Sequence, residues 1–122
     1  MDYIVKLTIK DLPPSLNKLY NMHYHQRAKY KKEWEQRVLN EISTDMLPFQ
    51  PYNKAVVNFR ICFGDNRRHD PDNINAGVSK PALDALVKAG VLEDDSIDNV
   101  TLVYSYDRST PRRFEITIEE EK

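Results

Sequence analysis

The 122-residue chain contains one cysteine, three glycines and one tryptophan, and it has no long apolar run. The single cysteine, Cys62, excludes an internal disulfide framework and a zinc site made of cysteines. No stretch approaches the ~20 apolar residues that a membrane-spanning helix needs. An early acid, Asp2, and alternating polar residues stand where a targeting peptide would have a basic leader and an apolar block. We therefore expect a soluble protein of the reducing cytoplasm with no membrane partner.

Charge is nearly balanced over the whole chain but not along it. The formal net charge is −1, yet residues 1–69 carry +5 and residues 70–122 carry −6. A net charge near zero argues against indiscriminate binding to nucleic acid, whereas a separate basic half is compatible with specific binding. The length predicts a single domain spanning residues 1–122.

Hydrophobic periodicity predicts an α/β fold with a small mixed β-sheet and two main helices. Apolar alternation and β-branched or aromatic content indicate strands at 3–9, 55–63, 100–104 and 114–118. Large residues at every fourth position predict a helix from Arg27 to about Ser43. A second helix is predicted from Asp72 to Ala89, with Gly90 as its C-terminal cap. Pro81 interrupts this pattern, so we expect a kink or two short helices there. The predicted order is β-α-β-α-β-β.

Acidic residues concentrate beside fixed positive charge where the second strand leads to the second helix. The run Asp70-Pro71-Asp72-Asn73 follows directly behind Arg67-Arg68-His69. Two aspartates two positions apart point the same way if the extended geometry of the strand continues, and they can then share a cation. Carboxylate oxygens suit Mg²⁺ or Mn²⁺, and arginine suits phosphate. The alternative is that Asp72 is an ordinary helix N-cap and Asp70 a turn former.

A second acidic cluster, Glu93-Asp94-Asp95 with Asp98, lies on the predicted loop behind Gly90. If a βαβ-like unit returns this loop to the strand end near Asp70, one of its carboxylates would complete a three-acid site. The alternative is a solvated loop. Together the two clusters indicate a metal-dependent phosphodiesterase that acts on nucleic acid.

Basic residues near these clusters are the candidates for contacts with phosphate. Lys80, on the predicted second helix, can stabilise negative charge that develops during cleavage. The remaining candidates for the DNA backbone are Arg27, Lys29, Lys31, Lys32, Arg67 and Arg68. Tyr24 and Tyr30 lie among them and could stack on exposed bases, although Tyr30 also fits the apolar face of the first helix.

The spacing of these motifs resembles the RusA family of Holliday junction resolvases. The resemblance rests on D-x-D-N at Asp70–Asn73, on a lysine four residues before D-A-L at Lys80 and Asp84–Leu86, and on the late pair Asp94-Asp95. Pro13-Pro14-Ser15 with Asn17 is similar to the N-terminal element of that family. The similarity extends over nearly the whole chain in length and element order.

The resemblance implies a Mg²⁺-dependent endodeoxyribonuclease, with Mn²⁺ as a substitute, that cuts four-way DNA junctions in recombination and repair as a homodimer. Proteins of this family are often encoded by prophages. Residue by residue, it implies metal binding by Asp70, Asp72 and Asp95 and a catalytic role for Lys80. The family archetype has its lysine where this chain has Ala76, as if one helical turn were inserted. Two alternatives stay open: a metal-dependent nuclease for other branched DNA, and a non-catalytic nucleic-acid-binding module.

Overall fold

Four strands and three α-helices make up residues 4–121, the part of the chain that the computed structural model describes. In chain order they are β1 Ile4–Lys10, α1 Leu16–Tyr20, α2 Tyr24–Glu41, β2 Ala55–Cys62, α3 Pro71–Lys88, β3 Val100–Asp107 and β4 Arg113–Glu120. The predicted α/β class with a small mixed sheet and two main helices is confirmed. The five-residue helix α1, which the sequence analysis did not predict, adds one element before α2.

The sheet has the strand order β1-β4-β2-β3. β4 is antiparallel to both of its neighbours, while β2 and β3 are parallel. A parallel pair needs a crossover connection, and α3 together with the loop behind it supplies this connection. Consequently both ends of α3 are tied to strand ends: the segment before α3 follows β2, and the segment after it leads into β3.

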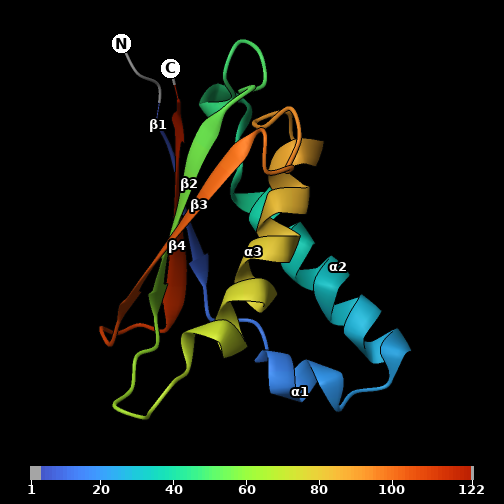
Figure 1. Cartoon of the computed structure of the whole chain (residues 1–122), viewed down its shortest axis with the longest axis vertical. Coiled ribbons are helices and arrows are strands. Elements are labelled where there is room, and N and C mark those ends of the chain that lie inside the picture. The colour runs from blue at the N-terminus through green and yellow to red at the C-terminus, as the bar shows by residue number, and fades with distance from the viewer. Residues whose placement is uncertain (1–3, 122) are drawn as a thin grey trace.

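The helices cover one face of the sheet (Figure 1), and the apolar core lies between these two layers. Phe59 and Ile61 of β2, Phe114 and Ile116 of β4 and Leu86 of α3 are each at most 1% exposed. Alternation along β1 is confirmed as well, because Val5, Leu7 and Ile9 are buried while their neighbours in sequence are exposed. Tyr3, the first residue of the predicted strand, lies outside the described residues. None of the helices in residues 4–121 is long and apolar enough to cross a membrane.

Helix α2 begins three residues before the predicted start. The imidazole Nδ1 of His23 accepts a hydrogen bond from the main-chain N–H of His25 at 3.3 Å, which caps the helix at its N-terminus. Trp34 and Val38 are buried, and Tyr30 and Leu39 pack against the same core. The period-four pattern therefore identified the buried face of the helix correctly but not its first turn.

Helix α3 is one continuous element through Pro81, so the predicted division into two short helices is wrong. Pro81 removes only one backbone donor, whereas Val78, Ala82 and Leu86 on either side of it are buried against the sheet. This packing outweighs the lost hydrogen bond. The helix ends at Lys88 with Ala89 as its C-cap, one residue before the predicted cap; Gly90 follows with a positive φ of 85°, and its N–H donates to the carbonyl of Val87 at 3.1 Å.

The segment from Pro13 to Tyr20 lies against α3. A Cβ built on Gly77 would stand 3.0 Å from the carbonyl oxygen of Pro14, so a larger residue at position 77 would require this segment to shift. The main-chain N–H of Asn17 donates to the side-chain carbonyl of Asn73 at 2.9 Å. The N-terminal element and the D-x-D-N element are therefore in direct contact.

Candidate nucleic-acid and metal site

Of the two motif aspartates, Asp70 ends an irregular loop and Asp72 lies in α3, so neither belongs to the end of a strand. β2 ends at Cys62 and α3 begins at Pro71, so residues 63–70 connect them. Asp70 occupies the N-cap position with extended backbone angles, and Asp72 lies in the first helical turn. The alternative role of Asp72 as the N-cap is thus wrong, and the extended geometry on which a common direction of the two carboxylates depended does not continue to Asp72. Pro71 favours a helical φ at the first position, which explains why the helix starts before Asp72.

Both motif carboxylates are exposed and little engaged by the protein. The side chain of Asp70 makes no capping hydrogen bond, and its Oδ1 lies 3.7 Å from Nε of Arg68, an exposed and weak ion pair. Asp72 is exposed and has no hydrogen-bond or ionic partner among the described residues. Their oxygens therefore remain available to a ligand.

Several contacts fix the backbone of the loop that precedes Asp70. The Oδ1 atom of Asp65 lies 2.7 Å from Nε2 of His69 and accepts the main-chain N–H of Arg67 at 3.1 Å. The hydrogen bond with His69 holds the pKa of the Asp65 carboxyl below its ordinary value. From the β3–β4 turn, Nη1 of Arg108 donates to the carbonyls of Asp65 and Arg67 at 3.2 and 2.6 Å. These contacts hold Arg67 and Arg68 next to Asp70.

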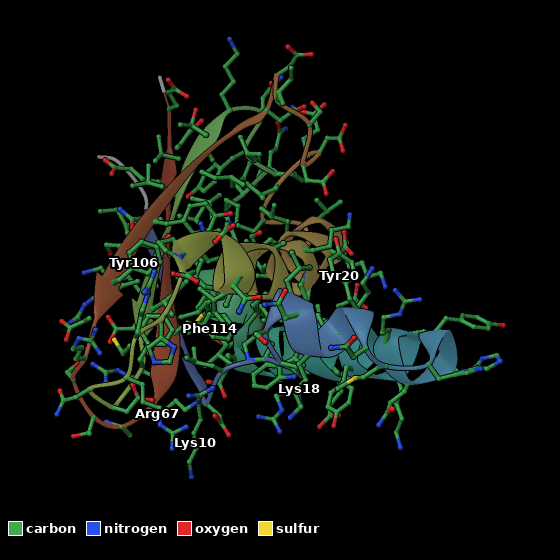
Figure 2. The ribbon with its side chains drawn as sticks, turned by 60° about the horizontal axis from the view of Figure 1, so that its bottom comes forward. Lys10, Lys18, Tyr20, Arg67, Tyr106 and Phe114 are labelled. Atoms are coloured by element: carbon green, nitrogen blue, oxygen red, sulfur yellow. The ribbon has the colours of Figure 1, made fainter. Side chains whose placement is uncertain are left out.

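A polar pocket of about 560 Å³ opens beside Asp70, between the loop, the segment before α1, and α2. Its cationic lining residues are Lys18, Arg37, Arg67, Arg68 and Arg112. Arg112 pairs with Asp11 at 3.1 Å and Arg37 with Glu33 at 3.5 Å. The side chains of Lys18 and Arg67 form no salt bridge in the described part of the chain, and Figure 2 shows both at the same end of the molecule. Hence two fixed cations remain available to an anionic ligand.

Lys80 lies away from the aspartate pair. Its Nζ is 3.1 Å from Oδ1 of Asp84 and 3.8 Å from Oδ2 of Asp95. The hydrogen bond with Asp84 is the main reason that the pKa of Lys80 is raised. Ten residues of helix separate Lys80 from Asp70, about 15 Å along the axis. Lys80 therefore does not lie over Asp70 and Asp72 within one chain.

The third predicted acid, Asp95, accompanies Lys80 rather than the other two aspartates. Within residues 4–121 no three acidic, histidine or cysteine side chains gather closely enough to hold a metal ion. The expected closure of a three-acid site within one chain is thus absent from the described structure. Asp70 and Asp72 alone still suit Mg²⁺ in kind and number, because this ion is commonly held by one or two carboxylates together with substrate phosphate and water.

The basic residues of α2 divide between a groove and the outer surface. Lys31 and Lys32 line a groove of about 300 Å³ between α2 and α3, together with Lys80. Arg27 and Lys31 line an adjoining pocket of about 440 Å³, whose rim includes the exposed Tyr20 and Tyr24. Lys29 is exposed and lines neither. A basic surface therefore extends from the tip of α2 to Lys80.

Lys18, Arg108 and Arg112 were not among the residues selected from the sequence. Lys18 belongs to α1, and the two arginines lie in the turn between β3 and β4, far from the motifs along the chain. The only signal was the family-like Pro13-Pro14-Ser15 element just before Lys18, which indicated that this region matters but not that it contacts the loop.

Comparison with models of known protein families and with curated proteins finds no match for this chain.

Proposed function

We propose that this protein is a Mg²⁺-dependent endodeoxyribonuclease of the RusA type that cleaves four-way DNA junctions. The observation that carries the proposal is the exposed carboxylate of Asp70 on the wall of a polar pocket that Lys18 and Arg67 also line, two positions before the exposed carboxylate of Asp72. Such a pair suits a hard cation, and the cations suit the phosphodiester on which that cation would act. The order of motifs along the chain supports the same assignment.

In this proposal each residue has a defined task. Asp70 and Asp72 hold the ion, which when bound supplies an activated water and stabilises the leaving oxygen of the phosphodiester. Arg67, Arg68 and Lys18 bind the phosphates that flank the cleaved bond. Arg27, Lys31 and Lys32 guide a more distant stretch of backbone along α2, and the exposed ring of Tyr24 is available for stacking on a base.

Asp95 and Lys80 need a second copy of the chain if they are to act with Asp70. In one chain they lie about 15 Å along α3 from Asp70, too far for a shared metal ion. A two-fold homodimer would solve this if it brings Asp95 and Lys80 of one copy to Asp70 and Asp72 of the other. It would also present two such sites to a junction that itself is nearly two-fold symmetric.

This arrangement can be tested with mixed dimers. Asp70→Asn and Asp95→Asn chains, each inactive alone, are co-expressed with different tags and isolated as the mixed species. If the two aspartates act across the dimer, one complete site is restored and one strand of the junction is nicked. If they act within one chain, the mixed dimer stays inactive. A strict monomer in sedimentation that still nicks DNA would favour the nuclease for other branched DNA.

A non-catalytic nucleic-acid-binding module is the second candidate, and the absence of a three-acid group from residues 4–121 favours it. The two functions differ in their need for metal. We expect a labelled four-way junction to be cut by the wild-type protein in Mg²⁺ and to stay intact in EDTA, although it is bound in both. Binding without cleavage in Mg²⁺ and in Mn²⁺ would identify the module instead.

A further inference from the structure

A second cleft lies on the other side of the loop that carries Asp70. It has a volume of about 360 Å³ and is lined by Phe63, His69, Pro71, Tyr106, Asp107 and Arg108. Phe63 and His69 also line the polar pocket, so these two stacked side chains lie between the two cavities. Asp70 follows His69 directly in the chain. A ligand in this cleft would therefore lie next to the site at which we propose that DNA is cut.

The cleft is built from nearly parallel aromatic rings. His69 stacks on Phe63 with centroids 3.9 Å apart and an angle of 8° between the rings. Tyr106 is inclined by 17° to Phe63 at 6.4 Å. Phe63 is buried, whereas Tyr106 is 41% exposed because it lies on the edge strand β3. The sheet thus presents a flat aromatic surface to solvent beside the start of α3.

Polar contacts hold this surface in place. The phenol of Tyr106 donates to Oδ1 of Asn75 on α3 at 2.7 Å, which fixes the ring against the helix. Arg108 uses one nitrogen for the two loop carbonyls, so its other N–H groups remain at the rim of the cleft. Asp107 is already engaged by Arg60 at 2.5 Å. The available chemistry is therefore a π-surface with a cation beside it.

We propose that this cleft binds an unpaired nucleobase of the DNA, stacked on Tyr106, with the adjoining phosphate held by Arg108. Aromatic side chains bordered by arginine are the usual means of holding an unstacked base, because every base offers a π-face and is followed by a phosphate. The inference rests on the proposed function, since it places the base next to the bond that is cut. Stacking on Tyr106 would hold one unpaired base beside that bond, whichever base it is.

The test compares two single-stranded oligonucleotides of equal length, one of thymidines and one of abasic residues, by fluorescence anisotropy in EDTA. Both carry the same phosphates, so the ratio of their dissociation constants reports contacts with bases alone. We expect wild-type protein to prefer the thymidine strand. Tyr106→Ala and Tyr106→Leu should reduce this preference roughly 5-fold or more, the effect of losing one stacked base. Tyr106→Phe retains the ring and should retain the preference.

Phe49→Ala is the matched control, because Phe49 is a fully exposed aromatic residue that lines none of these cavities. It should leave the ratio unchanged. Arg108→Ala should lower the affinity for the thymidine strand and for the abasic strand by the same factor. An unchanged ratio in both Tyr106→Ala and Tyr106→Leu, or no preference in the wild type, overturns the inference. Because the assay contains no metal, its outcome is independent of cleavage: a nuclease without the preference would refute only the base cleft, and the preference without Mg²⁺-dependent cleavage would refute only the nuclease.

Discussion

The main-chain N–H of Asn17 donates to the side-chain oxygen of Asn73 at 2.9 Å, across 56 positions of sequence. This bond joins α1 to the first turns of α3, where Asp70 and Asp72 lie. Lys18, the next residue after Asn17, lines the polar pocket. The element of residues 13–17 and the element of residues 70–73 are thus in direct contact although they are remote in sequence.

We expect Asn73→Ala to lower the free energy of unfolding by about 1 kcal/mol, the usual net value of one hydrogen bond, and to weaken DNA binding through the displacement of Lys18. Urea unfolding and anisotropy measure the two effects. Asn40→Ala is the control. It removes an exposed hydrogen bond that the side chain of Gln36 donates to Oδ1 of Asn40 at 2.8 Å, and this bond is remote from α1. Unchanged DNA affinity in Asn73→Ala would show that the bond does not position Lys18.

Replacing Arg67 and Arg68 together by alanine should weaken binding and flatten its dependence on salt. Each phosphate contact releases counterions, so the loss of two contacts lowers the slope of log affinity against log salt by nearly two. Titration of a junction at several salt concentrations gives this slope. Lys6 and Lys54, both exposed and outside every cavity described above, form the control pair and should leave it unchanged. An unaltered slope in the arginine variant would exclude the loop from the DNA interface.

Lys80→Ala should slow junction cleavage by about 10²- to 10³-fold, the usual cost of losing a preorganised charge, and should leave binding intact. Lys88→Ala is the control, since Lys88 is also an exposed lysine of α3 with an acidic partner, Glu35 at 2.9 Å. The double change Ala76→Lys with Lys80→Ala asks whether a lysine four residues after Asp72 can substitute. Wild-type activity in Lys80→Ala alone would show that this lysine serves only its two aspartates.

Stability should fall in acid through Asp107. The hydrogen bond from Arg60 lowers the pKa of Asp107 from 3.8 to about 2, so the folded state favours the ionised form. Its contribution to the free energy of unfolding is complete above about pH 4 and is lost as the pH falls towards 2. We expect Asp107→Asn to be less stable than wild type at pH 7 in urea unfolding, and most of this difference to be lost at pH 2. A difference that is as large at pH 2 as at pH 7 would assign the effect to packing.

Sequence periodicity predicted most of the fold because one face of each main element is buried. Val5, Leu7 and Ile9 alternate on β1, and Trp34 and Val38 repeat on α2, so burial imposes a readable pattern on both. Helix α1 has no buried residue, and its place depends on Gly77 and Asn73, which are remote in sequence. Local pattern therefore could not reveal it.

The site was predicted in composition but not in arrangement. The motif residues Asp70 and Asp72 lie together with Arg67 and Arg68 because they are neighbours in the chain. Asp95 and Lys80 lie together for a different reason: α3 runs without a break through Pro81, and the loop behind it returns along its middle. A helix continues through a proline only where the tertiary packing around that proline stabilises it. The spacing of residues along the sequence carries no information about this packing.

A junction-cleavage assay in Mg²⁺ tests the central claim most directly. It compares wild type on one gel with Asp70→Asn, Asp72→Asn and Asp95→Asn, and binding of the same variants is measured in parallel. The amide retains the shape of each side chain and removes the anionic ligand, so each variant should bind the junction at least as tightly as wild type and nearly lose cleavage. Asp98→Asn, on the same loop as Asp95, should cleave normally. Wild-type cleavage by Asp70→Asn and Asp72→Asn would contradict the account.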